Sequence, residues 1–320
     1  MDEPELLAPV DSSSQSRAEA TSAATPSTFA GWQEDVRNFL AKDLFFVGSF
    51  PKSGSTWLQV MLNAHPDIAC HGEGHFFDHL WPLLEDALKK HNGLIDLKNK
   101  TIFEEFQPFP RFDREHFNFL MASAMALLLS RYKDARNKRV VGEKTPNNLL
   151  HLMQLESVFP RAKFVQVVRD GRDCAVSAWF HNQRTNPEEL LRRHETFARF
   201  SEHIASIWSA NVEIGLRFSA SRPDRCLVIR YEDLCRDPGT TLRALFRFLA
   251  VDTGDALVHR CVTEGRFERM SGGRSAGVED RGSFLRRGVS GDWRNHFTIR
   301  SNRAFFGIAG AVMGRMGYHR

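Results

Sequence analysis

The sequence predicts an α/β protein with a central parallel β-sheet flanked by helices on both faces. Short apolar runs of strand length alternate along the chain with longer segments of helical spacing, and this alternation is typical of parallel sheets with crossover helices. The chain has 320 residues, of which 42% are hydrophobic, so it can bury a large core. Ligands of such sheets bind at the carboxyl ends of the strands, and the chemistry is expected in the loops that follow them.

The five predicted strands are apolar runs of four to seven residues, several of them closed by glycine, arginine or a charged turn. They lie at 43–49, 67–71, 139–143, 163–169 and 226–231. Helices are predicted where apolar residues recur at helical spacing, at 55–64, 114–133, 147–157, 171–184, 188–218, 238–250, 253–264 and 301–316. A variable stretch rich in Phe and His, to which no element is assigned, extends to about residue 115, and a Gly-, Arg- and Ser-rich loop is predicted over 270–292.

The first thirty residues differ in composition from the rest. They are rich in Ser, Ala, Thr and Pro and hold five acidic residues and one arginine. Too little apolar surface is available there to offset the entropy of ordering, so residues 1–30 are predicted to be a disordered tail and 31–320 a single domain. Without the tail, the chain's 43 basic and 39 acidic residues become 42 and 34, a net charge of +8. This charge suits an anionic ligand, but no basic run is long enough to indicate nucleic-acid binding.

The most informative segment follows the first strand and reads Phe50-Pro51-Lys52-Ser53-Gly54-Ser55-Thr56-Trp57. A strand, a short loop with glycine and lysine, and a helix N-terminus together form a phosphate cradle. Backbone N–H groups and the positive end of the helix dipole point at the anion, and Lys52 adds a full charge. The nucleotide triphosphatase pattern G-x-x-x-x-G-K-[ST] does not fit, because its second glycine falls on Ser53 and the lysine precedes Gly54.

A second anion-binding pattern closes the fourth predicted strand. The strand ends in Arg169, and Ser177 lies eight residues later on the following helix. A guanidinium offers a forked pair of donors to a phosphate, and the hydroxyl adds another. The alternative is a solvated arginine at a strand end.

These segments resemble sulfotransferases that use 3′-phosphoadenosine 5′-phosphosulfate (PAPS). Residues 51–57 are similar to the family's 5′-phosphosulfate loop, and residues 163–177 to its 3′-phosphate motif. Residues 226–234 resemble its late strand with a Tyr-Glu-Asp ending, and 284–293 its Arg-Lys-Gly loop and Gly-Asp-Trp, with Arg287 where lysine is common. The resemblance spans roughly residues 43 to 300 and implies a P-loop NTPase-like sulfotransferase fold.

The resemblance implies transfer of a sulfuryl group from PAPS to a hydroxyl or amine of an acceptor, with release of adenosine 3′,5′-bisphosphate (PAP) and no need for a metal. It also implies which residues bind the co-substrate. They are Lys52, Ser53, Gly54, Ser55, Thr56, Trp57, Arg169, Ser177, Tyr231, Arg286, Arg287 and Gly288. The family places Trp57 against the adenine; plain core packing is the alternative.

The catalytic base is sought in the segment after the phosphate-loop helix. Residues 65–78 resemble the stretch of heparan sulfate sulfotransferases in which a Glu-x-His-Phe-Phe sequence supplies the base. This maps the base onto Glu73, with His75 as support, and Lys52 as the group that stabilises the leaving oxygens. Lys144 resembles a family lysine near the transferred sulfate. His75 itself, His71 and Glu143 remain candidates for the base, whereas the Lys-Thr-His base of cytosolic sulfotransferases has no histidine here, where Lys144-Thr145 is followed by Pro146.

A metal site is the competing interpretation of the same segment. His71, His75 and His79 recur every four residues and would share one face of a helix. Gly72 and Gly74 disfavour a helix there, so no metal is predicted.

Several questions stay open at this point. A nucleotide-dependent kinase and a catalytically inactive PAP-binding scaffold are the alternative functions. Residues 72–135, 185–200 and 270–285 are expected to shape the acceptor pocket, for a small molecule or a saccharide, and a lipid-like alcohol, a phenol or a peptide tyrosine also fits. No apolar segment approaches membrane-spanning length, no secretion signal is visible, and five cysteines lack metal or disulfide spacing. A cytoplasmic protein is predicted, and a homodimer is compatible with the sequence.

Overall fold

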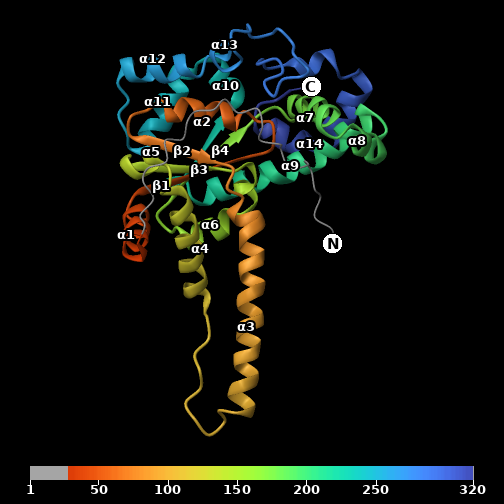
Figure 1. The fold of residues 1–320 in the computed structure, drawn as a ribbon. Coiled ribbons are helices and arrows are strands. Elements are labelled where there is room, and N and C mark those ends of the chain that lie inside the picture. The colour runs from red at the N-terminus through yellow and green to blue at the C-terminus, as the bar shows by residue number, and fades with distance from the viewer. Residues whose placement is uncertain (1–27, 320) are drawn as a thin grey trace.

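A computed structural model describes residues 28–319 (Figure 1). Positions 1–27 of the predicted tail lie outside the described residues. Thr28 caps the first helix, α1 (Phe29–Leu40), by accepting a hydrogen bond from the Gly31 N–H through its side chain. Regular structure therefore begins two residues before the predicted domain boundary.

Five parallel strands form one sheet in the order β2-β3-β1-β4-β5. They are β1 (Asp43–Ser49), β2 (Ile68–Gly72), β3 (Val140–Lys144), β4 (Lys163–Val168) and β5 (Cys226–Arg230). Each lies within one residue of its predicted bounds, because each is a compact apolar run that a parallel sheet buries on both sides. The prediction of an α/β fold on a parallel sheet is confirmed.

Helices cover both faces of the sheet (Figure 1). Along β1, Phe46 packs with α4 and α6, while Phe45 and Val47 pack with α2 and α11 on the opposite face, as the alternation of side chains along a strand requires. A third core cluster joins α7, α9 and α14 beside the sheet. The remaining elements are listed here with their bounds: α2 (Ser55–Asn63), η1 (Phe76–Leu80), α3 (Trp81–Thr101), α4 (Arg114–Leu129), α5 (Lys133–Asn137), η2 (Pro146–Leu150), α6 (Leu152–Val158), α7 (Gly171–Thr185), α8 (Pro187–His194), α9 (Phe197–Ser221), α10 (Tyr231–Arg236), α11 (Pro238–Leu249), α12 (Asp255–Glu264), α13 (Phe267–Met270), η3 (Asp292–Asn295) and α14 (Ile299–Arg315).

Two predicted helices are each divided in the structure. The single helix expected at 188–218 is α8 followed by α9, because Glu195 takes a left-handed φ of 55° and Thr196 then caps α9. The helix expected at 147–157 is a 3₁₀ turn, η2, followed by α6. Short helical pieces that begin at caps or prolines are easily merged when only apolar spacing is read.

The largest element that the prediction missed is α3, a helix of 21 residues in the variable stretch to which no element was assigned. Pro82 occupies its first turn, where proline is well tolerated. Apolar residues occur on two sides of this helix, so the pattern of a single apolar stripe is blurred. Together with the returning chain it projects from the body (Figure 1). Within residues 28–319, no helix combines the length and the apolar character that crossing a membrane requires.

The contact between β1 and η2 generates a stability prediction. A Cβ on Gly48 would lie 2.6 Å from the backbone N of Leu149, so Gly48→Ala forces two backbones apart and should lower the free energy of unfolding by about 1–3 kcal/mol. Gly93→Ala in α3 meets no atom within 4 Å and should not destabilise the protein. Urea unfolding followed by circular dichroism measures both variants. Equal midpoints for Gly48→Ala and the wild type would contradict this packing.

Candidate functional site

The loops that carry the predicted site residues follow neighbouring strands. Gly72 of β2 is paired with Lys144 of β3, and Ser49 of β1 with Val167 of β4. In a parallel sheet the carboxyl ends of the strands share one edge. The phosphate loop, the Glu73 segment, Lys144, Arg169 and Tyr231 are therefore brought to the same edge of the sheet.

The phosphate loop joins β1 to α2 in a backbone conformation that requires glycine at one position. Gly54 precedes α2 with a φ of 89°, and a Cβ there would lie 2.5 Å from the ring of Tyr231. Lys52 also has a positive φ, 68°. The Ser53 hydroxyl lies 3.6 Å from the Cys174 sulfur, and the Ser49 hydroxyl donates to that of Ser55 at 3.3 Å. The N-terminus of α2, with Thr56 in its first turn, faces the loop.

Lys52 is a partly buried cation among other cations. Burial and then repulsion from Arg184 lower the pKa of Lys52 to about 8; nearby Glu73 raises it and Lys144 lowers it. Its ammonium lies 4.7 Å from the centre of the Phe284 ring. Among the described residues it forms no ion pair within 4.0 Å of a carboxylate. A bound anion would therefore supply the charge partner that this lysine lacks.

Arg169 connects three parts of the site. Its guanidinium donates to the carbonyl oxygens of Lys52 (3.1 Å) and Val289 (3.0 Å). It lies over the Tyr231 ring, 4.4 Å from its centre, and 3.9 Å from the Asp173 carboxylate. Its buried Nε has no hydrogen-bond partner in the structure. Ser177 lies on α7, partly exposed, two turns into the helix that Arg169 precedes.

Asp173, which sequence reasoning missed, holds residues 284–293, here called the late loop, against α7. Its carboxylate accepts the backbone N–H groups of Gly291 (2.6 Å) and Trp293 (2.8 Å). Arg172 beside it is fully buried, paired with Asp170, and stacked 3.5 Å from Trp293. The sequence predicts phosphate contacts from the Arg-Asp-Gly-Arg-Asp segment at 169–173. The structure shows in addition that Asp173 of this segment positions the Gly-Asp-Trp segment.

The late loop presents Arg286 and Arg287 already paired with a carboxylate. Both guanidinium groups donate to Asp292, and Arg286 also pairs with Glu279. Gly288 has a φ of 67°, and a Cβ there would lie 2.2 Å from the ring of Phe267. A phosphate bound by these arginines would share them with Asp292.

The rings of Trp57 and Tyr231 pack edge to face beside the phosphate loop. The indole N–H of Trp57 donates to the Gly265 carbonyl at 2.6 Å, and its ring meets Tyr231 edge-on at 5.6 Å between centres. This fixes the orientation of the indole. The ring is only partly buried, which leaves part of its surface accessible to a ligand.

Glu73 and Lys144 form an ion pair at the ends of β2 and β3. The Lys144 ammonium donates to Glu73 Oε1 at 2.5 Å. The Lys144 side chain is 4% exposed and that of Glu73 39%. The buried lysine thus holds one oxygen of a carboxylate whose side chain stays partly exposed.

Glu143, the residue before Lys144, is buried, whereas Glu73 is partly exposed. The Glu143 carboxylate accepts hydrogen bonds from Thr145 (2.6 Å), Asn148 (2.6 Å) and the Gly74 N–H (3.1 Å). Burial raises the pKa of Glu143 against the opposing effect of these bonds. It anchors the Glu73 loop, a role that sequence reasoning missed.

The three histidines of the segment do not share a face. His71 stacks on Tyr132 and bonds to Asp134, whereas His75 lies at the start of η1 and bonds to Asp78 at 2.8 Å. The ligand atoms of His75, Asp78 and His79 lie within 4.8 Å of one another and could hold a metal ion. The prediction that no metal is needed stays a prediction.

A cavity of about 1460 Å³ lies beside the phosphate loop. Its walls come from α2, the end of β2, residues 131–138 and the 264–285 region, including Thr56, Gly72 and Phe284. Two of the three segments expected to shape an acceptor pocket, 72–135 and 270–285, contribute to this lining; residues 185–200 do not. The charged residues of the lining are mainly basic. Five are basic (Arg131, Lys133, Lys138, Arg184 and Arg269) and two are acidic (Asp134 and Glu264).

Comparisons with known proteins agree with this geometry. Residues 44–255 match the sulfotransferase family. The chain is 27% identical over 222 residues to protein-tyrosine sulfotransferase 1 of Danio rerio, which covers 68% of this chain but only 55% of that protein. It is 24% identical over 302 residues to sulfotransferase 1C2 of Homo sapiens, covering 88% and 86% of the two chains.

Solved structures share the fold. The mouse sulfotransferase SULT7A1, crystallised with PAP, superposes with a TM-score of 0.54 at 23% identity over 88% of each chain. A sulfotransferase from Alicyclobacillus acidocaldarius superposes with a TM-score of 0.50 at 20% identity, covering 88% of this chain and 98% of that one. Since the family match extends over well more than half of the sequence and includes the first three motifs, the chain belongs to the sulfotransferase family.

Proposed function

We propose that this protein transfers the sulfuryl group of PAPS to a hydroxyl or amine of an acceptor and releases PAP. The observation that carries the proposal is the position of Arg169. Its guanidinium bonds to the backbone of the phosphate loop at Lys52 and to the late loop at Val289. Arg169 thus lies between Lys52 on the phosphate loop and the arginines Arg286 and Arg287 on the late loop. Cations on both sides suit a nucleotide with phosphates on both its 5′ and 3′ sides.

The residues around Arg169 suit the parts of such a nucleotide. Lys52 and the backbone of residues 53–56 would bind the 5′-phosphosulfate, and Arg169 with Ser177 the 3′-phosphate. The orphaned Nε of Arg169 and the cradle that a Cβ on Gly54 would fill support this assignment. Arg286, Arg287 and Gly288 would close over the 3′ side, with Trp57 and Tyr231 against the adenine. The mouse relative of the same fold binds PAP.

The reaction needs a base, an oriented acceptor and stabilisation of the leaving group. The acceptor oxygen or nitrogen forms a bond to sulfur while the bond from sulfur to the 5′-phosphate oxygen breaks. The acceptor's proton passes to the Glu73 carboxylate, and the electron pair of the broken bond remains on the phosphate of PAP. Lys52 stabilises that developing charge, while Lys144 orients Glu73.

Glu73 fits the role of base better than its competitors. It is partly exposed, with one oxygen held by Lys144. Glu143 is buried and its carboxylate is occupied by three donors. His71 is held by Asp134 and His75 by Asp78. His75 therefore supports the loop through Asp78 and does not act on Glu73 directly.

The cavity beside the loop is the proposed acceptor site. Its mainly basic lining favours an acceptor that carries negative charge near the reacting hydroxyl or amine. One relative is named a protein-tyrosine sulfotransferase, and the name of the other, sulfotransferase 1C2, gives no acceptor. A small molecule, a saccharide and a peptide are therefore all included in the acceptor screen.

We also propose a metal-independent enzyme of the cytoplasm. All five cysteines are free and four are buried, as is typical of proteins kept in reducing compartments. A nucleotide-dependent kinase is the alternative activity, and it would be stabilised against heat by ATP with magnesium. An inactive scaffold would bind PAP without turnover.

Replacing the base tests the proposed chemistry. Glu73→Gln keeps the size of the side chain and removes its ability to accept a proton, so kcat should fall by about 10²–10⁴-fold while PAP affinity changes little. Transfer from labelled PAPS and PAP calorimetry measure the two quantities. Glu202→Gln, a change of the same kind at an exposed position of α9 outside the cavity, should keep near-normal kcat. Equal loss of binding and turnover in Glu73→Gln would assign Glu73 to the binding of the nucleotide.

The pKa of Lys52 generates a pH prediction. Burial and neighbouring cations lower it to about 8 in the free protein, so the charged form that binds the anion declines as pH rises through 8. Bound anion raises this pKa, and PAP affinity should fall by up to about tenfold per pH unit above 8. Calorimetry between pH 7 and 9.5 measures the slope.

Lys52→Arg provides the control for this slope. Arginine stays charged throughout that range, so the variant should show an almost flat profile whatever its absolute affinity. The same slope in both proteins would show that another group governs the pH dependence.

A further inference from the structure

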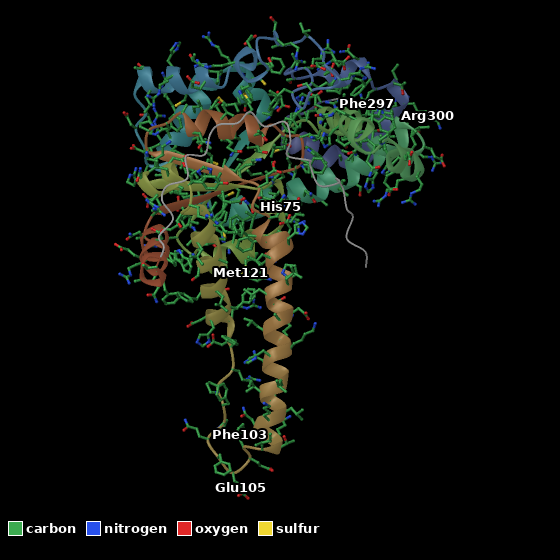
Figure 2. All side chains as sticks on the ribbon, viewed as in Figure 1. His75, Phe103, Glu105, Met121, Phe297 and Arg300 are labelled. Carbon is green, nitrogen blue, oxygen red and sulfur yellow. The ribbon has the colours of Figure 1, made fainter. Side chains whose placement is uncertain are left out.

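The most unusual part of the molecule is an arm that takes no part in the site. It consists of α3 and the segment 102–113 that returns the chain to α4, and it projects from the body (Figure 1). Figure 2 shows His75 near its base and Phe103 and Glu105 at its far end. The helix has 21 residues, a length of about 30 Å. None of its residues lines the cavity.

The arm is built by specific contacts and is not a loose loop. The Asn92 and Asn99 side chains each donate to a backbone carbonyl and accept a backbone N–H of the returning segment, at Phe112 and Phe109 respectively, at 2.8–3.0 Å. Between them Arg111 donates two hydrogen bonds to Asp96, at 2.8 and 2.9 Å. One face of α3 is thereby covered by the returning chain.

The opposite face of α3 carries an apolar stripe that stays exposed within residues 28–319. At 3.6 residues per turn, Leu83, Ala87, Leu94 and Leu97 lie about half a turn from Asn92 and Asn99. The three leucines are 69%, 50% and 58% exposed. With Lys90 and Thr101 these positions follow the alternating four- and three-residue steps of a coiled-coil seam. Such a seam is typical of a helix that packs along another helix.

We propose that this stripe pairs with the same stripe of a second copy, with the two α3 helices antiparallel. The six seam positions are self-complementary: in an antiparallel pair Leu83 lies beside Thr101, Ala87 beside Leu97, and Lys90 beside Leu94. Asp86 holds the Lys90 ammonium at 2.7 Å, so the four-carbon stem of Lys90 is free to cover Leu94 of the second copy.

The charges of the arm determine the direction of pairing. Glu104 and Glu105 are exposed at the tip. Parallel pairing would bring four carboxylates together. Antiparallel pairing brings each tip beside the N-terminal end of the other α3, where the helix dipole is positive and where His79 and Arg114 add basic groups.

The exposed apolar area is sufficient for a stable pair. The stripe leucines Leu83, Leu94 and Leu97, with Ile102 and Phe106 beyond the end of α3, are all at least half exposed. Together these five side chains present roughly 500 Å² of apolar surface at ~100 Å² each. A standard interface buries about 800 Å² per partner, a little over half of it apolar. The arm of one copy therefore matches what one side of such an interface needs.

The oligomeric state of the full chain tests this proposal. Light scattering after size exclusion should show a dimer for the wild type. Leu94→Glu combined with Leu97→Glu should weaken the dimer at least 100-fold, to a monomer at micromolar concentration, and its far-ultraviolet circular dichroism spectrum should remain that of the folded protein. Ile299→Glu, at a 77% exposed residue far from the arm in sequence, should remain dimeric. A monomeric wild type, or a dimer that survives the double change, would overturn the proposal.

Cross-linking tests the direction. In a Cys235→Ser background, which removes the exposed thiol, Ala87→Cys and Leu97→Cys proteins should form a disulfide with each other when mixed and oxidised, and neither should cross-link alone. Cross-linking of each variant with itself would indicate parallel pairing and contradict the proposed geometry. Binding of the wild type, but not the double variant, to phosphatidylcholine–phosphatidylglycerol vesicles would assign the stripe to a membrane and likewise overturn the proposal.

Discussion

The contacts of Arg169 are the interaction on which the rest of the site depends. One guanidinium bonds to the phosphate loop, bonds to the late loop, covers the Tyr231 ring and approaches Asp173. These four partners come from four separate segments of the chain. The parallel pairing of β1 with β4 makes this possible, because it places the end of each strand beside the other. A planar group with five donors can join such segments, whereas a lysine could not.

The electrostatics around this arginine are arranged for an anion. Burial, Lys52 and Arg184 together lower the pKa of His181 to about 4, so even a histidine is kept neutral near the loop. Cations that repel one another in a partly buried site are costly for folding, and a bound phosphate relieves that cost. The buried carboxylates have a different task. Asp173 and Glu143 bind backbone N–H groups and so fix the loops that carry the cations.

The sheet and the motifs could be predicted from the sequence because both are local. Each strand is a continuous apolar run, and the phosphate loop of residues 50–57 is recognised by its own residues. The parts that were missed depend on contacts between distant segments. Asp173 bonds to Gly291 and Trp293, which lie 118 and 120 residues further along the chain. The pairing of Arg286 and Arg287 with Asp292 is local, but it depends on the path of the loop, which spacing does not reveal. The helix α3 was missed because its apolar residues lie on two sides, with Leu84 and Leu88 packed against the core and Leu83, Leu94 and Leu97 exposed, and so do not give a single periodic face. Glu195 was missed as a break because its left-handed φ leaves no mark in composition.

The central claim is that Arg169 and Lys52 together bind one nucleotide with phosphates on both its 3′ and 5′ sides. Calorimetric titration with PAP and with AMP, which lacks the 3′-phosphate, tests it most directly, using the wild type and Arg169→Lys. The account predicts that the wild type binds PAP at least 100-fold more tightly than AMP. Arg169→Lys, which keeps the charge but loses the fork, should bring the two affinities to within about tenfold of each other. Equal affinity of the wild type for PAP and AMP would contradict the account.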